Sequence, residues 1–341
     1  MTETLSWLAL ARGTLDRATE RRGDEEWLAR VWAHPRTRVL VVERGRALVR
    51  VQDSPALVLL PPAEAPDGER YLLGVDADKG AVENADGSSG KGADEGAAKN
   101  ADEGADGDVN EGADEGDEIA YFAVNGPLPA VSGAEAGTLR RVGALLNDRD
   151  SGLLVHAVAL QNWHSTHPCC PRCGSRTAVT SAGASRTCPD DGSEHFPRVD
   201  PAVIMLVYDD ADRILLARQS QWPERRVSIL AGFVEPGESL EQAVIREVAE
   251  EVGLTVRDLR YLGSQPWPLP QSLMVGYFCR AVDARLLRVD EDEIVEAHWY
   301  TRDELRAAIL AGDILLPGKV SIARHLIENW YGGELPGSWG L

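Results

Sequence analysis

The stretch Gly232–Leu254 constrains the fold of this chain more than any other part of the sequence. It opens with a loop in which the dipeptide Pro236–Gly237 predicts a turn. Residues 239–252 contain neither glycine nor proline, which predicts a helix, and Gly253 predicts its end. The sequence therefore indicates a tight loop followed at once by a helix.

Acidic side chains of the predicted helix fall on its apolar side. At helical spacing one arc carries three apolar residues, namely Leu240, Val244 and Val248. Glu247 and Glu251 project into the same arc and Glu250 lies at its border, whereas an ordinary amphipathic helix places its acids on the opposite face. Crowded carboxylates repel one another unless cations bind between them, and grouped oxygen ligands suit Mg²⁺ or Mn²⁺ and a phosphate substrate. The alternative is a solvated acidic helix.

The same stretch resembles the Nudix box. The fixed positions of that pattern are matched by Gly232, Glu238 and the run Arg246–Leu254. The resemblance implies a strand–loop–helix–loop that binds divalent metal and hydrolyses a diphosphate linked to another group. It also implies the fold class, α/β with a Nudix α/β/α sandwich, which we place at residues 200–331.

Length and composition predict two or three domains and no membrane span. The chain has 341 residues, of which 43% are hydrophobic, and contains no apolar run of about eighteen residues. No signal peptide is visible at its start. Five cysteines, three of them clustered, indicate a reducing compartment and a metal site rather than disulfides. These features predict a cytoplasmic protein with no membrane partner.

Most of the net charge of −20 lies in one low-complexity segment. Residues 76–118 hold fifteen acidic residues against three lysines and repeat the motif Gly-Ala-Asp-Glu-Gly. This composition cannot bury a core and predicts a disordered acidic insertion; the alternative is an acidic segment that binds a partner or cations. The rest of the chain is only mildly acidic, so no large basic surface supports a nucleic-acid role.

Residues 1–163 are predicted to form an N-terminal, mostly β, α/β domain around that insertion. Short apolar runs predict three strands, at 38–42, 46–51 and 56–60. The runs that flank the insertion, 71–73 and 119–124, predict two adjacent strands joined by it. A helix is predicted over 153–163.

Residues 164–199 contain a cysteine pattern typical of half a zinc ribbon. Cys170 and Cys173 form a Cys-x-x-Cys-Gly turn, and Cys188 follows where a second pair would begin. The fourth thiolate is missing, and we predict His195 as the ligand in its place; the alternatives are Asp191, Cys169 and His167. The zinc would be structural, and the competing hypothesis is a ribbon held by packing without metal.

A proline-rich segment, Ser264–Met274, follows the predicted Nudix helix. Its three closely spaced prolines are incompatible with a central strand, which predicts a stiff loop that displays Trp267 and Gln271. An aromatic ring with nearby amides suits a nucleotide or nicotinamide ring. The segment resembles the Ser-Gln-Pro-Trp-Pro-Phe-Pro-x-Ser array of NAD(H) diphosphatases, with Leu269 in place of phenylalanine. With the ribbon and the Phe-Pro-Arg at 196–198, this resemblance covers about residues 153–328.

That resemblance implies roles for individual residues. The catalytic group would consist of Glu247, Glu250, Glu251 and Arg246, of which Arg246 orients the carboxylates. Two or three Mg²⁺ or Mn²⁺ ions would be held by these three glutamates with the Ala231 carbonyl and Glu293, for which Glu296 is the alternative. Phe196 and Phe233 would stack on a substrate ring, Arg140 would contact phosphate unless it is an ordinary surface arginine, and Ala323 would line the pocket. The remaining substrate residues would be Gln265, Pro266, Trp267, Pro268, Leu269, Pro270, Gln271 and Ser272.

The reaction implied by the resemblance is hydrolysis of NAD(H) to NMN(H) and AMP. The same chemistry would remove an NAD cap from an RNA 5′ end, and the resemblance also implies a homodimer. One alternative is a Nudix enzyme for another nucleotide diphosphate such as ADP-ribose, which the proline–tryptophan segment disfavours. Another is a non-catalytic NAD-sensing module, which the intact acids of the box disfavour. A role of the ribbon in RNA processing is weakened by its missing fourth cysteine.

Overall fold

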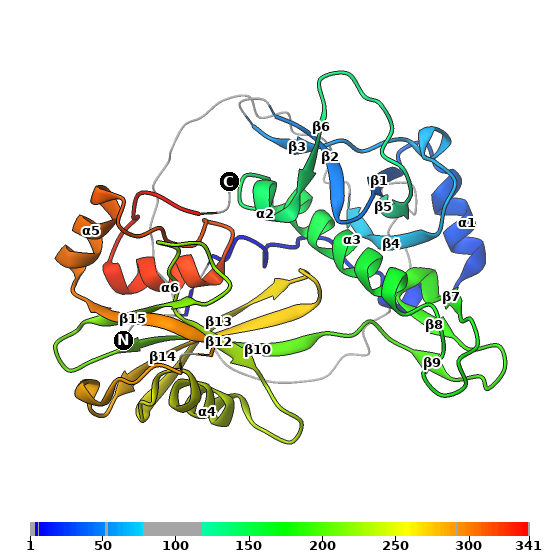
Figure 1. The fold of residues 1–341 in the computed structure, drawn as a ribbon. Coiled ribbons are helices and arrows are strands. Elements are labelled where there is room, and N and C mark those ends of the chain that lie inside the picture. The colour runs from blue at the N-terminus through cyan, green and yellow to red at the C-terminus, as the bar shows by residue number, and fades with distance from the viewer. Residues whose placement is uncertain (1–3, 6, 52–53, 78–117, 291, 340–341) are drawn as a thin grey trace, which may run out of the picture.

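The computed structural model describes residues 4–5, 7–51, 54–77, 118–290 and 292–339. Figure 1 shows an N-terminal α/β half beside a C-terminal α/β half, with a small ribbon at the far end of helix α3 (Asp148–Thr166). The predicted disorder of the acidic insertion concerns residues that, from 78 to 117, lie outside the described part. Within the described ranges, no helix is both long and apolar enough to cross a membrane.

The N-terminal half contains two three-stranded sheets. One sheet has the order β1 (Arg38–Val42), β5 (Glu118–Asn125), β4 (Arg70–Ala77). The other has the order β3 (Ala56–Leu57), β2 (Arg46–Arg50), β6 (Glu135–Thr138). Strands β4 and β5 pair antiparallel and end with Ala77 opposite Glu118, so the prediction that the insertion joins adjacent strands is confirmed.

Helix α3 packs along these sheets. Its N-terminus is capped by Asn147, whose side chain accepts a hydrogen bond from the backbone N–H of Asp150. Its buried residues Leu153, Leu154 and Val158 join the core of this half, which accounts for the helix predicted there. The other helical segments of this half are η1 (Thr19–Arg21), α1 (Glu25–Ala33), η2 (Pro62–Glu64) and α2 (Leu139–Val142).

The ribbon is a three-stranded antiparallel sheet fixed to α3. It consists of β7 (Ala178–Thr180), η3 (Ser181–Gly183), β8 (Ser185–Thr187) and β9 (Glu194–His195). The buried Arg186 donates hydrogen bonds to the Thr177 carbonyl at 2.8 Å and to His164 Nδ1 of α3 at 2.9 Å. The His164 ring in turn stacks on Tyr71 at 4.3 Å between ring centroids. These contacts attach the ribbon firmly to the N-terminal half.

The C-terminal half is built on one six-stranded mixed sheet. Its order is β13 (Val256–Trp267), β14 (Ser272–Ala281), β10 (Asp200–Tyr208), β11 (Ile214–Gln219), β15 (Ile294–Tyr300), and β12 (Leu230–Phe233) pairs with β10. The helical segments are α4 (Leu240–Val252), η4 (Ala284–Leu286), α5 (Arg302–Ala311) and α6 (Ile322–Tyr331).

Side chains that alternate along β10 fill two separate cores. Val203 and Met205 face the core that contains Val244 of α4, whereas Ile204 and Leu206 face the core that contains Leu326 of α6. Period-two alternation is the property of a strand buried on both faces. The sheet is therefore covered by α4 on one side and by α5 and α6 on the other, and the predicted α/β/α sandwich is confirmed (Figure 1).

The proline-rich segment differs from its prediction. Ser264–Trp267 is the end of β13 and pairs with β14, so that Gln265 lies opposite Met274 and Trp267 opposite Ser272. Only the turn at residues 268–271 leaves the ladder. The prediction of a loop was wrong because β13 is the edge strand of its sheet, and an edge strand tolerates prolines that a central strand excludes.

Candidate active site

Helix α4 is placed by its two ends. Ser239 accepts a hydrogen bond from the N–H of Gln242, and the Gln242 side chain accepts one from the N–H of Ser239, which forms a complete capping box. At the other end Gly253 adopts φ +66°, a left-handed conformation that favours glycine. Val244 and Val248 are fully buried against the sheet. The helix therefore has one fixed orientation, which directs its acids toward β12.

Arg246 organises the carboxylates at the start of the site. Its guanidinium donates to both oxygens of Glu238, at 2.8 and 2.9 Å, and to the Phe233 carbonyl at 2.9 Å. It also donates to Glu247 at 2.9 Å and to Glu250 at 2.8 Å. The hydrogen bonds that Arg246 donates to Glu238 and the neighbouring glutamates raise the pKa of Arg246 above its ordinary value. The Arg246 guanidinium thus holds the carboxylates of Glu238, Glu247 and Glu250 in place.

Glu251 is the unusual member of the group. Its side chain is buried, at 3% exposure, and its Oε2 has no hydrogen-bond partner among the described residues. Burial, with the charges of Glu247, Glu293 and Glu250, raises its pKa to about 8. A buried, unsatisfied carboxyl oxygen is costly unless another group binds it. Glu251 therefore has the properties of a ligand whose partner is a cation.

Glycine at position 232 allows β12 to pass close to the acids of α4. A Cβ atom built on Gly232 would lie 1.8 Å from Glu247 Cδ, so any larger residue would displace the Glu247 carboxylate. The Glu247 carboxylate therefore occupies the space that any other residue would fill. Burial raises its pKa, and the hydrogen bond from Arg246 opposes this.

The two acids proposed as a further ligand have different environments. Glu296 forms an ion pair with Arg218 of the adjacent strand and lies near His298. Glu293 is exposed, forms no ion pair within the described chain, and contributes to the raised pKa values of Glu247 and Glu251. The surroundings therefore favour Glu293 over Glu296.

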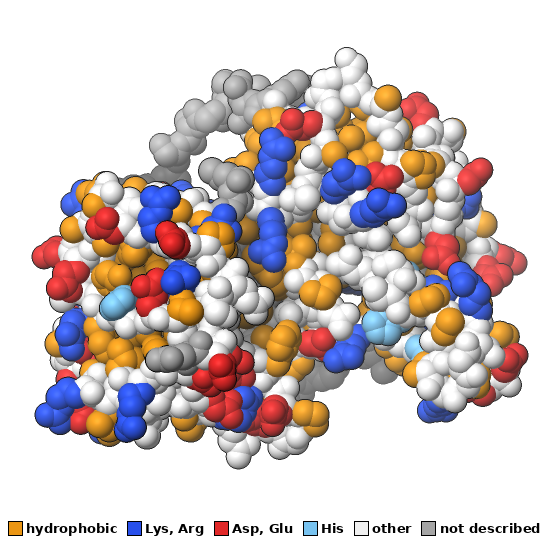
Figure 2. Space-filling view, viewed as in Figure 1, with side chains coloured by type: hydrophobic (Ala, Val, Ile, Leu, Met, Phe, Trp, Pro, Cys, Tyr) orange, Lys and Arg blue, Asp and Glu red, His pale blue; other side chains and the backbone are white. Residues whose placement is uncertain are grey.

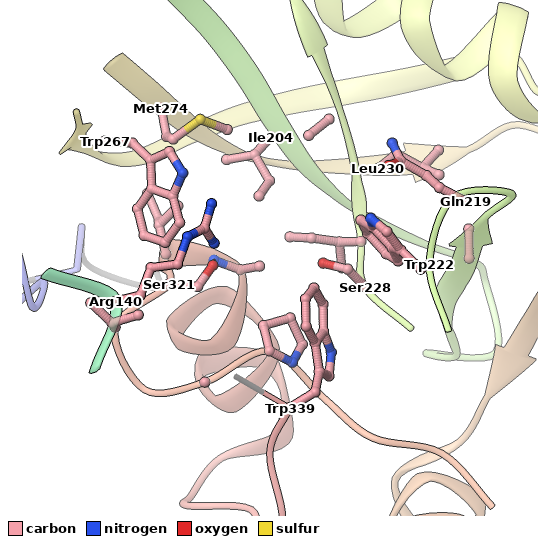
Figure 3. A pocket seen from close by; sticks show the side chains of 18 of the residues that line it. Arg140, Ile204, Gln219, Trp222, Ser228, Leu230, Trp267, Met274, Ser321 and Trp339 are labelled. Atoms are coloured by element: carbon pink, nitrogen blue, oxygen red, sulfur yellow. The ribbon is translucent and has the colours of Figure 1, made fainter. Parts of the chain in front are cut away.

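A cavity of about 300 Å³ opens beside Glu251. Figure 3 shows its side chains, which come from α2, the sheet, α6 and the C-terminal segment. Of the predicted site residues, it is lined by Ala231, Glu251, Arg140, Trp267 and Ala323. In Figure 2, acidic side chains gather near α4 and basic side chains near α2. The same cavity is therefore lined by residues predicted to bind metal, Ala231 and Glu251, and by residues predicted to bind substrate.

Arg140 reaches this cavity from the N-terminal half. Its guanidinium lies over the Trp267 ring, 5.0 Å from the ring centroid, a cation–π geometry. Burial lowers its pKa, and no carboxylate of the described residues forms an ion pair with it. Arg140 is thus an exposed cation that lines the cavity beside Trp267.

The remaining predicted substrate residues, all within the described ranges, do not line the cavity. They are Gln265, Pro266, Pro268, Leu269, Pro270, Gln271, Ser272, Phe196 and Phe233. Gln265 is fully buried, where its side chain accepts from the Leu10 N–H at 3.2 Å and donates to the Val320 carbonyl at 3.0 Å. The Gln271 amide donates to Asp200 at 2.8 Å. The Gln265 amide therefore binds backbone groups and the Gln271 amide binds the Asp200 side chain. Neither amide lines the cavity.

Phe196 and Phe233 are highly exposed, at 65% and 60%. The structure places neither in the cavity, and their stacking role stays a prediction. Sequence reasoning missed two other aromatics, Trp222 and Trp339, which line the cavity. Trp222 follows β11 and Trp339 lies close to the C-terminus, and neither carries a recognisable motif, so only the fold brings them together.

The ribbon forms a second candidate metal site. Ligand atoms of Cys170, Cys173, Cys188 and Asp191 all lie within 4.8 Å of one another. Each half is a turn closed by glycine: the N–H of Gly174 donates to the Cys170 carbonyl, and that of Gly192 to the Cys188 carbonyl. The two hexapeptides, Cys-Pro-Arg-Cys-Gly-Ser and Cys-Pro-Asp-Asp-Gly-Ser, are therefore structural equivalents. Three thiolates and one carboxylate fit tetrahedral zinc.

The structure groups Asp191, and not His195, with the three cysteines, so His195 as the fourth ligand stays a prediction. His195 Nε2 lies 2.9 Å from Ser193 Oγ, and the Ser193 hydroxyl donates to Asp191 at 2.5 Å. His195 thus contacts Ser193 and also forms a side-chain hydrogen bond with Cys170, whereas Asp191 occupies the turn position that corresponds to Cys173. The reason is that the second glycine turn repeats the first, and this places position 191 at the corner.

Comparison with known proteins gives matches to two families. Residues 198–316 match the NUDIX domain, and residues 165–196 match the NADH pyrophosphatase zinc ribbon domain. The order of the two matches along the chain is that of the ribbon and the sandwich described above.

Two relatives found by sequence agree with these matches. NAD-capped RNA hydrolase NudC of Mycobacterium bovis is 53% identical over 205 residues, which cover 58% of this chain and 66% of that protein. NAD-capped RNA hydrolase NUDT12 of Pongo abelii is 31% identical over 93% of this chain and 71% of that protein. A NUDIX hydrolase structure from Nitrosomonas europaea is 20% identical, with a TM-score of 0.39 over 49% of this chain and 94% of that one. The matched region spans just under two thirds of the mycobacterial relative, and the chain belongs to the Nudix hydrolase family, in the NudC-like branch with an NADH pyrophosphatase-type zinc ribbon.

Proposed function

We propose that this protein hydrolyses the pyrophosphate bond of NAD(H) to give NMN(H) and AMP. The observation that carries the proposal is one cavity lined by Glu251, Arg140 and Trp267. It combines a carboxylate suited to divalent metal, a guanidinium suited to phosphate and an indole ring suited to a planar base. The same cleavage would remove an NAD cap from an RNA 5′ end, an activity that the names of both relatives suggest.

Divalent ions fit the residues present. The orphaned Oε2 of Glu251 supports this, as does the close passage of Gly232 beside Glu247. We propose that two or three Mg²⁺ or Mn²⁺ ions are held by the box glutamates, the Ala231 carbonyl and Glu293. When bound, such ions neutralise phosphate charge and activate the attacking water.

The chain's own groups position the carboxylates and the substrate. Arg246 fixes Glu247 and Glu250, and it is a positioning residue because its hydrogen bonds within the described chain all go to protein oxygens. Arg140 would bind the pyrophosphate, because a guanidinium that lines the cavity and has no ion-pair partner in the described chain is free to pair with phosphate oxygens. Trp267 would offer its ring to one base. The reaction adds one water: its oxygen joins one phosphorus, and the bridging oxygen leaves with the other mononucleotide.

In the ribbon, we propose one structural zinc ion held by Cys170, Cys173, Cys188 and Asp191. A closed set of four protein ligands leaves no position for a substrate, so the role is structural. The homodimer and the cytoplasmic location also stay proposals, and size-exclusion chromatography with light scattering would test the homodimer.

A side-by-side hydrolysis assay tests the function. With Mg²⁺ or Mn²⁺, we expect NADH, NAD and NAD-capped RNA to be cleaved, with AMP and NMNH as the products of NADH. Glu251→Gln should reduce kcat by roughly 100- to 1000-fold, the range for removing one electrostatic stabiliser. Glu26→Gln, at an exposed position of α1, is the control and should match the wild type.

Two outcomes would contradict the proposal. Cleavage of ADP-ribose far faster than NADH would assign the site to another nucleotide diphosphate. Full activity of the folded Glu251→Gln protein would exclude Glu251 as a metal ligand.

A further inference from the structure

The last described residues, 332–339, turn back from α6 and end in the cavity. The backbone N–H of Trp339 donates to the Leu316 carbonyl at 2.8 Å, and Pro317 pairs with Trp339 in a parallel bridge. The indole Nε1–H donates to the Val227 carbonyl at 3.3 Å. Trp339 is therefore held by both its backbone and its side chain, beside residues that themselves line the cavity.

A buried ion pair fixes the segment that leads to Trp339. Arg324 of α6 is 1% exposed and donates to Glu328 at 2.8 Å. The same guanidinium donates to the carbonyls of Leu335 and Gly337, and Glu328 accepts the Leu335 N–H at 2.9 Å. Breaking a buried pair leaves an uncompensated charge, at a high cost in stability. These contacts of Arg324 and Glu328 hold the C-terminal segment in one position against α6.

Trp339 meets a second tryptophan at the cavity wall. The rings of Trp222 and Trp339 lie 5.2 Å apart between centroids, with 48° between their planes. The Arg226 guanidinium lies over Trp339 at 5.3 Å from its centroid. Both tryptophans are only partly buried, so ring surface is open to the cavity. They form an aromatic wall, defined here as Trp222 and Trp339.

The cavity thus has aromatic surfaces on two sides. Figure 3 shows Trp267 with Arg140 on one side, and Trp222 with Trp339 on the other. A dinucleotide has two bases joined through its phosphates, and a single indole accounts for only one of them. Every base offers a π face, so a second aromatic wall suits the second base whatever its hydrogen-bonding groups.

We propose that the wall formed by Trp222 and Trp339 binds the second base of the dinucleotide while Trp267 binds the first. The C-terminal segment is then a specificity element, since it distinguishes substrates with two bases from those with one. This inference rests on the function proposed above.

The test compares Trp339→Ala with Trp267→Ala. Loss of one stacking surface should raise KM for NADH by about 5- to 100-fold, with kcat changing less. AMP and NMN, measured as product inhibitors, separate the two base sites: each variant should weaken inhibition by a different mononucleotide. Trp339→Phe should restore much of the affinity, because it retains an aromatic ring. A chain that ends after Ser338 should behave like Trp339→Ala, and Trp7→Ala, outside the cavity lining, should match the wild type.

The results separate failure of the inference from failure of the function. If the wild type cleaves NADH but Trp339→Ala has unchanged KM and inhibition constants, the wall does not bind a base. The same holds if both variants weaken the same mononucleotide. If the wild type neither cleaves NADH nor is inhibited by AMP or NMN, the proposed function fails and the inference fails with it.

Discussion

At the scale of single residues, burial distinguishes acids that look alike in sequence. Glu250 is exposed and ion-paired with Arg246, whereas Glu251 is buried with one oxygen unsatisfied among the described residues. Helical spacing placed Glu251 on the apolar arc, but it could not show that Arg246 would take up Glu247 and Glu250 and leave Glu251 without a partner. The pKa of Glu251, raised to about 8, follows from that isolation.

This raised pKa predicts how stability depends on pH in metal-free protein. Between the ordinary glutamate value of about 4.3 and about 8, the folded state binds the Glu251 proton more tightly than the unfolded state does. The contribution of Glu251 to stability should therefore fall as pH rises through this window. Glu251→Gln should lose less Tm than the wild type from pH 5 to pH 8.5 in EDTA, with about 2–4 °C corresponding to each kcal/mol.

Thermal unfolding measures this difference, and Glu26→Gln is again the control. Addition of Mg²⁺ should raise the Tm of the wild type more than that of Glu251→Gln, because ligands of the native state stabilise it. Parallel pH profiles of the two proteins in EDTA would contradict the assignment of a buried, isolated carboxyl.

At the scale of elements, the structures of the proline-rich stretch and of the second ribbon turn could be predicted only partly from their sequences. The proline-rich stretch is an edge strand, and whether a strand lies at the edge is decided by the order of the sheet. The ribbon turn at 188–193 repeats the turn at 170–175, so Asp191 takes the position of a cysteine. Residue chemistry alone favoured His195, since imidazole is a common zinc ligand.

The zinc ligands can be tested on the purified protein by metal competition. Asp191→Cys should tighten zinc binding, because thiolate is the softer ligand, and should strengthen the thiolate charge-transfer absorption of the Co²⁺ form. His195→Ala should cost at most the roughly 10- to 100-fold typical of groups outside the ligand shell, and Asp191→Ala should cost more. The reverse order would restore His195 as the ligand, and absence of zinc would favour the ribbon without metal.

At the scale of the whole molecule, the cavity is a joint product of distant parts of the chain. Arg140 comes from the N-terminal half, Glu251 and Trp267 from the sandwich, and Trp339 from the C-terminal segment. The acidic insertion, by contrast, joins two strands whose last described residues, Ala77 and Glu118, are already register partners. Their pairing brings β4 and β5 together at the positions where the insertion begins and ends.

Replacement of residues 78–117 by Asn-Gly should therefore leave NADH hydrolysis unchanged. A two-residue turn of this type closes an antiparallel hairpin directly. Because each doubling of loop length costs about 0.6 kcal/mol, the shortened protein should be more stable by on the order of 2 kcal/mol. Chemical denaturation and the hydrolysis assay measure both effects. A less stable or less active protein would favour the alternative that the segment binds cations or a partner.

The sequence by itself determined the loop–helix of residues 232–253 and the flanking strands of the insertion. These features depend on local spacing and on burial patterns, which the order of residues carries directly. Only the tertiary structure decided that Gln265 and Gln271 turn away from the cavity, that Asp191 is a corner of the ribbon site, and that Trp222 meets Trp339. These depend on contacts between residues far apart in sequence, and no local pattern specifies which distant partner will fill a given space.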